Sequence, residues 1–311
     1  MKIAITGALG HIGSFLIRQL PDYIPDLDLI LLDNLSTQRY SSLFNLPSNA
    51  KYKFYDVDVV ETNIESLIRD AEIVIHLAAI TNATESFSNH TEVEHINYNA
   101  TVRVAEACSK TGSSLIHISS TSVYGTQNEV VDEDCSKEEL NPQSPYAATK
   151  LKEEDFLQNF AEKGNLNFIT CRFGTICGIS PGMRFHTAVN KFCWQAVLGQ
   201  PVTVWRTALD QKRPYLTLEE ASRAIWFIIE NKLFDRRVYN ILSDNLTVQS
   251  VIDFIKVHVP LLSVSYVDEK VMNQLSYEVL NKRFSSKGFI FKGDIPASIA
   301  DTIRLLNSNL S

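Results

Sequence analysis

The chain has 311 residues, of which 45% are hydrophobic and 21% are charged, and its formal net charge is -7. This length allows a large buried core, while an acidic chain without a basic stripe is a poor candidate for a nucleic-acid surface. No apolar run approaches the ~20 residues needed to span a bilayer, so no membrane association is expected.

The first half of the chain alternates short apolar runs with longer amphipathic ones. Strands are predicted at 2–6, 28–32, 51–55, 73–77, 114–118 and 167–172, and helices at 11–20, 62–69, 94–110 and 144–163. Near-continuous apolar strands suit a parallel sheet that is covered on both faces. Strand–helix alternation therefore predicts an α/β fold with a doubly wound parallel sheet.

The alternation changes after Arg172. Helices are predicted at 186–199, 219–231 and 248–258, strands at 201–205 and 237–241, and an irregular polar tail from about 265. We expect a cofactor-binding domain over residues 1–172 and a smaller α/β substrate lobe over 173–311, with interleaving of the two allowed for. Ligands of such sheets bind at the carboxyl edge.

The spacing of the cysteines and the first residues of the chain favour a reducing cellular compartment. Cys108, Cys135, Cys171, Cys177 and Cys193 form no Cys-x-x-Cys pair and no cluster with zinc spacing. Free thiols in a reducing compartment are the simpler reading. The chain starts directly with a predicted strand at 2–6, so no signal peptide is expected. We expect a cytoplasmic protein without a metal site.

A glycine-rich turn follows the first predicted strand and precedes the first predicted helix. It reads Gly7-Ala8-Leu9-Gly10-His11-Ile12-Gly13, which is the context and spacing of a Rossmann-type dinucleotide fingerprint. Gly7 would permit the tight turn, Gly10 the approach of a pyrophosphate, and Gly13 close helix packing. The alternative is a glycine-containing turn without a ligand.

An acidic residue ends the second predicted strand, about twenty residues after the glycines. Asp33, followed by Asn34, can accept hydrogen bonds from both adenosine ribose hydroxyls and would repel a 2′-phosphate. This favours NAD over NADP. The alternative is an ordinary turn former at a strand end.

Tyr146 and Lys150 lie four residues apart on a predicted helix that follows the serine-rich end of a strand. Residues at this spacing share a helix face. An ordinary tyrosine titrates near pH ~10, and a nearby ammonium favours its phenolate form. The pattern therefore predicts a tyrosine that acts as a base in a redox enzyme.

These motifs occur together in one order. The chain resembles, from residue 1 to about 235, the extended short-chain dehydrogenase/reductase family, and in particular NAD-dependent nucleotide-sugar epimerases of the UDP-galactose 4-epimerase type. The resemblance rests on the spaced glycines, Asp33, Asp58-Val59, Leu77-Ala78-Ala79, Asn97-x-x-x-Thr101, Ser120-x-x-Val123-Tyr124-Gly125 and Pro145-Tyr146-x-x-x-Lys150.

The resemblance implies a role for each matching residue. Tyr146 would be the base and acid, Lys150 would hold the nicotinamide ribose, and Ser120 and Ser122 would lie close to the reacting sugar oxygen. The reaction would be a transient oxidation of the sugar. NAD would be bound by Gly7, Gly10, His11, Ile12, Gly13, Asp33, Asn34, Asp58, Val59, Leu77, Ala78, Ala79, Asn97, Ser119, Tyr146 and Lys150.

The chain departs from the family pattern at positions that determine substrate specificity. Thr121-Ser122 stands where the family's 4,6-dehydratases carry an Asp-Glu pair, so elimination would lack its acid and base. Thr175 replaces an asparagine that binds substrate phosphate, and Arg213 would contact the diphosphate. Arg184 is either a phosphate or carboxylate partner or a solvated loop arginine. The expected substrate-binding residues are Thr121, Thr175, Arg184 and Arg213.

An epimerase acting on a nucleotide-diphosphate sugar is thus the leading hypothesis. The alternatives are an NAD-dependent nucleotide-sugar dehydrogenase, reductase or decarboxylase, and an NAD-binding protein without catalysis. The resemblance also implies a homodimer in which the helix after Asn97 and the helix carrying Tyr146 pair with a second copy. Val102, Ala105, Phe156 and Phe160 would face either that copy or the sheet.

Overall fold

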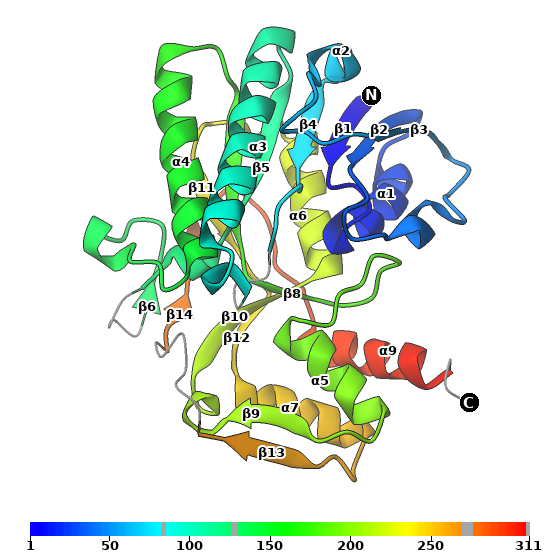
Figure 1. Cartoon of the computed structure of the whole chain (residues 1–311), viewed down its shortest axis with the longest axis vertical. Coiled ribbons are helices and arrows are strands. Elements are labelled where there is room, and N and C mark those ends of the chain that lie inside the picture. The colour runs from blue at the N-terminus through cyan, green and yellow to red at the C-terminus, as the bar shows by residue number, and fades with distance from the viewer. Residues whose placement is uncertain (82–84, 126–129, 269–275, 309–311) are drawn as a thin grey trace.

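The large layer of the molecule is a parallel β-sheet (Figure 1). The computed structural model describes residues 1–81, 85–125, 130–268 and 276–308. Within these residues, strands lie in the order β11-β7-β5-β4-β1-β2-β3, and every neighbouring pair is parallel. Their bounds are β1 Lys2–Thr6, β2 Leu27–Asp33, β3 Ala50–Asp56, β4 Ile73–His76, β5 Ser114–Ser120, β7 Phe168–Phe173 and β11 Val238–Ile241. The strand order runs outward from β1 in both directions, which confirms the predicted doubly wound α/β fold.

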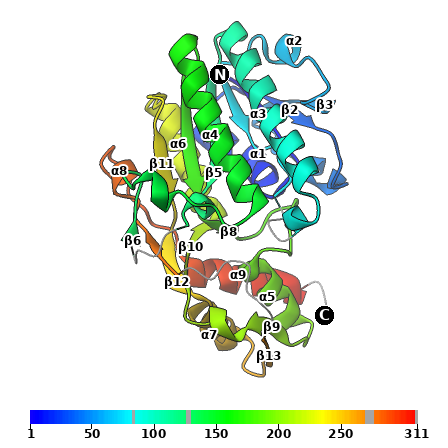
Figure 2. The same ribbon diagram turned by 60° about the vertical axis from the view of Figure 1, so that its left-hand side comes forward.

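Helices cover both faces of this sheet (Figure 2). One face carries α2 (Glu65–Ile68), α3 (His90–Thr111) and α4 (Pro145–Lys163), and the other carries α1 (His11–Tyr23) and α6 (Leu218–Glu230). Every residue of β4 and β7 is buried, as expected for a parallel sheet between two helical layers. Two apolar cores result, one on each face of the sheet.

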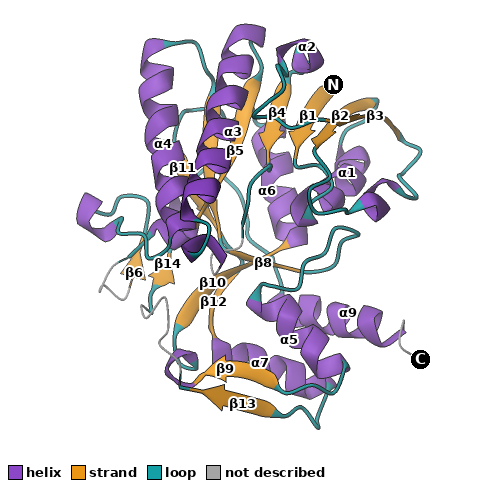
Figure 3. Ribbon diagram, viewed as in Figure 1, coloured by secondary structure: helices purple, strands orange, loops and turns teal. Residues whose placement is uncertain are grey.

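A smaller lobe lies at the carboxyl edge of the large sheet (Figure 3). Its central sheet has the order β12-β10-β8, and β9 pairs with β13. The bounds are β8 Thr175–Cys177, β9 Val202–Trp205, β10 Lys212–Thr217, β12 Asp244–Thr247, β13 Val264–Val267, α5 Ala188–Val197, α7 Val248–His258 and α9 Ile295–Ser308. The remaining elements are β6 Val130–Val131, β14 Glu278–Val279, α8 Lys282–Ser285 and the short 3-10 helices Tyr40–Leu43, Glu85–Phe87, Thr121–Val123, Lys137–Glu139 and Arg206–Ala208.

The expectation of an irregular tail from about 265 is wrong. The tail contains β13, β14, α8 and the amphipathic helix α9, which buries Ile295, Ile299 and Ile303 against α5 and α7. These isoleucines are four residues apart, so they lie on one helix face. Glu220 of α6 accepts hydrogen bonds from the backbone N–H groups of Lys292 and Gly293, which ties the start of α9 to the large layer.

The chain passes between the large layer and the lobe more than once. After β8 it builds α5 and β10 in the lobe, returns for α6 and β11, and enters the lobe again at β12. The elements that follow residue 172 therefore contribute to both parts, and the assignment of cofactor and substrate to the two predicted segments stays a prediction. No helix in the described part of the chain has the length and apolar character needed to cross a membrane.

Candidate active site

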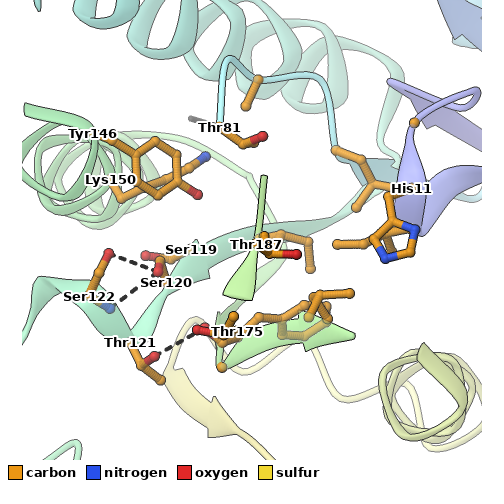
Figure 4. Close-up of a pocket in the computed structure, with 18 of the residues that line it drawn as sticks. His11, Thr81, Ser119, Ser120, Thr121, Ser122, Tyr146, Lys150, Thr175 and Thr187 are labelled. Carbon is orange, nitrogen blue, oxygen red and sulfur yellow. Dashed lines mark hydrogen bonds between the residues drawn. The ribbon is translucent and has the colours of Figure 1, made fainter. Parts of the chain in front are cut away.

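A cavity of about 360 Å³ lies at the carboxyl ends of β1, β4, β5 and β7. Figure 4 shows side chains from α4, β5, β8 and the glycine-rich turn pointing into it. The cationic side chains of Arg39, Lys150, Arg184 and Arg213 line the cavity, whereas none of its described lining residues is Asp or Glu. The cavity is therefore suited to an anionic ligand. No cluster of His, Cys, Asp or Glu that could hold a metal occurs among the residues described.

Most of the predicted site residues meet in this cavity. Those that line it are Gly7, Gly10, His11, Ile12, Gly13, Leu77, Ala79, Ser119, Ser120, Thr121, Ser122, Tyr146, Lys150, Thr175, Arg184 and Arg213. The predicted residues outside the lining are Asp33, Asn34, Asp58, Val59, Ala78 and Asn97. Of these, Val59 belongs to the apolar core on the α3 face of the sheet.

The glycine-rich turn fits a dinucleotide. Gly7 has a positive φ of 63°, and a Cβ atom there would lie 2.7 Å from Ala78 N. A Cβ atom on Gly13 would lie 2.6 Å from Ala8 O, so neither position accepts a side chain. Gly10 borders the cavity at the start of α1. A helix N-terminus of this kind binds the pyrophosphate of a dinucleotide through its free N–H groups.

Asp33, Asn34 and Asp58 brace the loops around that turn. Asp33 Oδ2 accepts a hydrogen bond from Leu9 N at 3.0 Å, and Asn34 Nδ2 donates one to Asp58 Oδ2 at 2.9 Å. The Asp33 carboxylate therefore stands beside the turn at the end of β2, where a ribose would reach it.

Asn97 of α3 supports the segment that follows β4. Its Oδ1 accepts a hydrogen bond from Ile80 N at 2.7 Å, and its Nδ2 donates one to Ile80 O at 2.9 Å. The amide thus holds the backbone at Ile80, the residue after Ala79, and lies outside the lining of the cavity. In this structure Asn97 orients backbone rather than facing the cavity.

Helix α4 presents Tyr146 and Lys150 to the cavity. The helix begins after Ser144, whose side chain accepts a hydrogen bond from Ala147 N, and Pro145 occupies its first turn. Figure 4 shows the Tyr146 ring beside the Lys150 side chain. Burial alone would lower the pKa of Lys150, but the nearby Glu153 and Tyr146 raise it above its usual value. Lys150 is thus an ammonium next to a phenol.

The hydroxyls after β5 form a short chain of hydrogen bonds (Figure 4). Ser122 Oγ donates to Ser120 Oγ at 2.8 Å, and Ser122 N lies 3.2 Å from the same oxygen. Thr121 Oγ1 donates to Phe173 O at 3.2 Å. Ser119 Oγ donates to Glu154 Oε1, so this hydroxyl is engaged with the protein. Ser120 and Ser122 line the same cavity as Tyr146, and their hydroxyls bond only within this pair among the residues that the structure describes.

Arg184 lies in the cavity and is not a solvated loop arginine. It donates to Thr81 Oγ1 across the cavity, and its Nε has no hydrogen-bond partner among the residues described. Burial lowers its pKa, and the nearby Tyr146 acts in the opposite direction. Arg213 on β10 also lines the cavity. The two guanidinium groups therefore reach the same space from the segment after β8 and from β10.

Several lining residues were not anticipated from the sequence. They are Arg39, His76, Thr81, Ile118, Phe173, Gly174, Ile176, His186, Thr187, Pro214 and Tyr277. His76 ends β4, directly before the Leu77-Ala78-Ala79 stretch of the family pattern. Most of the others come from loops or from the small sheet, where no spacing singles them out.

Residues 178–187, which connect β8 to α5, are docked on the glycine-rich turn. His11 Nδ1 lies 2.8 Å from Ser180 Oγ, and Asn190 Nδ2 lies 3.3 Å from His11 Nε2. Gly182 N donates to Ser14 Oγ at 2.9 Å. Burial, and secondarily Arg184, lower the pKa of His11 to about 3, so the ring is neutral. The segment therefore covers the predicted pyrophosphate site.

Comparison with known proteins places this geometry in a family. The model of the NAD dependent epimerase/dehydratase family matches residues 3–241. The chain is 27% identical to an uncharacterized UDP-glucose epimerase of Bacillus subtilis, over 74% of this chain and 72% of that protein. It is also 26% identical to a trifunctional UDP-glucose 4,6-dehydratase/UDP-4-keto-6-deoxy-D-glucose 3,5-epimerase/UDP-4-keto-L-rhamnose-reductase of Arabidopsis thaliana. That match covers 99% of this chain but only 47% of the relative, so the chain spans about half the length of that protein.

A solved structure agrees with this assignment. MoeE5 in complex with UDP-glucuronic acid and NAD superimposes with a TM-score of 0.85 at 25% identity, over 99% of this chain and 100% of that chain. The family is NAD-dependent, and its relatives include both epimerases and dehydratases. NAD is therefore the cofactor. The chain belongs to the NAD dependent epimerase/dehydratase family.

Proposed function

We propose that this protein is a nucleotide-sugar epimerase in which Tyr146 acts as the base. The observation that carries the proposal is the chemistry of the cavity wall. A tyrosine, a lysine and serine hydroxyls lie together there, while none of the described lining residues carries a carboxyl group. Elimination of water needs a general acid and a general base at the departing groups. Thr121 and Ser122 supply only hydroxyls, which supports epimerisation over dehydration.

The reaction would begin with removal of a proton from a sugar hydroxyl. Tyr146 would take this proton as a phenolate, and the Lys150 ammonium beside it would stabilise the phenolate charge. Ser120 and Ser122 would hold the sugar oxygen, since a hydroxyl can rotate from its present partner to a new one. NAD, when bound, would accept a hydride from the sugar carbon and return it to the opposite face of the resulting ketone, which inverts that carbon. Tyr146 would then give the proton back to the new stereoisomer.

The substrate that we propose for this cavity is a nucleotide-diphosphate sugar. Arg184, from the segment after β8, and Arg213, on β10, both line the cavity, and planar guanidinium groups bind phosphate through paired hydrogen bonds. MoeE5 has been solved with UDP-glucuronic acid and also with UDP-glucose at 25% identity. Both ligands therefore belong in the set of compounds to be tested.

The direct test is product analysis. The purified protein is incubated with a panel of nucleotide-diphosphate sugars, and the products are separated by chromatography while NADH absorbance is followed. We expect one substrate to give a stereoisomer with no lasting change in NADH. Net NADH, a ketone or release of carbon dioxide without any stereoisomer would instead support a dehydrogenase, reductase or decarboxylase.

Replacing the proposed base gives the matching control. Tyr146→Phe should lower kcat by at least about a hundredfold, the usual contribution of a positioned acid–base group, and should leave the NAD content unchanged. Tyr266→Phe, at an exposed tyrosine on β13, should behave like the native protein. A Tyr146→Phe variant with native turnover would remove the proposed base, and an NAD-binding protein without catalysis would show no turnover in any variant.

A further inference from the structure

A buried cluster of polar side chains lies behind Lys150, away from the cavity. Glu153 Oε2 accepts hydrogen bonds from Lys150 Nζ, His117 Nε2 and Thr101 Oγ1, each at 2.9 Å. Glu153 is fully buried. The three donors come from α4, β5 and α3, so the carboxylate is fixed in one position by separate elements.

The neighbouring carboxylate serves another partner. Glu154 Oε2 accepts from Arg172 Nη2 at 2.6 Å, and its other oxygen accepts from Ser119 and Arg172 Nε. Arg172 also donates to Tyr124 OH at 2.9 Å. The two adjacent carboxylates are thus divided between two cations, and Glu153 is the direct counter-charge of Lys150.

Lys150 needs such a counter-charge. Its side chain is 5% exposed, and burial favours the neutral amine of a lysine, in extreme cases by several pKa units. Among the influences on the pKa of Lys150, burial is the largest and lowers it, while Glu153 is the next and raises it, followed by Tyr146. Without an ammonium at this position, a phenolate on Tyr146 would lose the cation that lies beside it (Figure 4).

We propose that Glu153 is a positioning residue that keeps Lys150 charged and directed toward Tyr146, and that it acts on Tyr146 only through Lys150. The inference rests on the proposed function, in which Tyr146 is the base. It assigns a role in the reaction to a side chain that touches neither the cavity nor a ligand.

Three titratable groups around the pair, Glu153, His76 and Arg184, hold constant charges near neutral pH. Burial would raise the pKa of Glu153, but Lys150 and His117 lower it to about 2, so it stays ionised. His76, stacked on His117 with ring centroids 6.4 Å apart, has its pKa lowered to about 3 by burial and by Lys150. Arg184 faces Tyr146 from the segment after β8 and remains a cation. None of these three groups therefore changes its charge in the neutral to alkaline range.

The test measures ionisation of Tyr146 in the holoenzyme. The ultraviolet absorbance of tyrosinate is followed against pH for each variant, and the curve of the same variant carrying Tyr146→Phe is subtracted. Glu153→Gln should raise the midpoint by about one pH unit, because Lys150 without its counter-charge loses its proton more readily, and loss of an opposite charge within a few ångströms of Tyr146 shifts a pKa by that order. The matched control, Asp155→Asn, removes an exposed carboxylate from the same helix and should leave the midpoint unchanged. An unchanged or lowered midpoint in Glu153→Gln overturns the proposal.

Two further variants keep the test decisive if Glu153→Gln folds poorly. Glu153→Asp retracts the carboxylate by one methylene and should raise the midpoint by a smaller amount. Lys150→Met/Glu153→Gln removes both members of the buried pair and should have the same midpoint as Lys150→Met alone. A further shift in the double variant would show that Glu153 acts directly on Tyr146, which contradicts the proposal. These titrations need no turnover, so their result stands even if no sugar is epimerised.

Turnover gives a second readout where a substrate is found. If the midpoint rises by one pH unit, the phenolate fraction below that midpoint falls about tenfold. We therefore expect kcat of Glu153→Gln to fall about tenfold with little change in KM, and its loss to shrink as the pH is raised. A purely structural role would instead lower thermal stability and leave the pH dependence of kcat as in the native protein.

Discussion

The side chains that meet in the cavity divide the proposed reaction among them. Tyr146 and Lys150 stand on α4, Ser120 and Ser122 at the end of β5, and the guanidinium of Arg184 reaches across to Thr81. A helix and a strand end hold the proton-transfer groups, whereas Arg184, one of the two expected anion partners, comes from a connecting segment. A residue in the first group should control turnover, and a residue in the second should control binding.

Arg184 tests this division. Arg184→Met should raise the KM of the nucleotide-diphosphate sugar about tenfold, the loss expected when one charge-assisted hydrogen bond to phosphate is removed, with a smaller effect on kcat. Steady-state kinetics measures both constants. Arg304→Met, at an exposed arginine of α9, is the control and should be neutral. A fall in kcat at native KM would place Arg184 with the reacting atoms instead.

Secondary structure was predictable where buried residues recur along the chain with the repeat of a strand or of a helix. The apolar strands of the large sheet read directly from the sequence, and the helix predicted at 94–110 is observed as α3. None of the strands of the small sheet, β8, β10 and β12, was predicted; β10, for example, carries Pro214 and charged residues that resemble a loop. Helix α9 was missed because its four-residue isoleucine spacing follows a long polar stretch.

For the site, sequence motifs marked the glycine-rich turn, the end of β5 and α4. No motif marks Arg39, which reaches the cavity from a loop.

Helix α9 should contribute measurably to folding. Ile299 is fully buried between α5 and α7, so Ile299→Ala should lower the free energy of unfolding by about 2–4 kcal/mol. Ile290→Ala, at a side chain that is 67% exposed, should change it by less than about 0.5 kcal/mol. Chemical denaturation followed by circular dichroism gives both values. Equal small effects would mean that α9 is not part of the folded core.

Segment 178–187 should slow the release of NAD. Ser180→Ala removes the hydroxyl next to His11, and loss of one hydrogen bond, roughly 1 kcal/mol, corresponds to about fivefold faster release. The rate is measured by trapping free NAD after dilution of the holoenzyme. Ser265→Ala, at an exposed serine of β13, is the control. Native release in Ser180→Ala would show that this contact does not retain the cofactor.

At the scale of the whole molecule, the outer faces of α3 and α4 bear on the proposed homodimer. Ala105 is fully buried in the core, so it does not face a partner. Val102, Phe156 and Phe160 are partly exposed, and the rings of Tyr98, Phe156 and Phe160 pack in a row. An aromatic row on two parallel-lying helices is suited to pairing with a second copy.

Sedimentation tests the dimer. At micromolar concentration we expect a species of twice the 35.0 kDa chain mass. Phe160→Asp should shift it to the monomer, because a charge in an apolar interface is costly to desolvate. Lys163→Asp, at an exposed residue on the same helix, controls for the added charge. A native protein that sediments only as a monomer would contradict the expectation.

The central claim, epimerisation through Tyr146 without elimination, is tested most directly with a nucleotide-diphosphate sugar that carries deuterium on every sugar carbon. The holoenzyme is incubated with this compound in ordinary water, and the products are separated and weighed by mass spectrometry. The account predicts a new stereoisomer of unchanged mass, with all deuterium retained and none formed by Tyr146→Phe. A product lighter by one water, or one that has exchanged carbon-bound deuterium for solvent hydrogen, would contradict it.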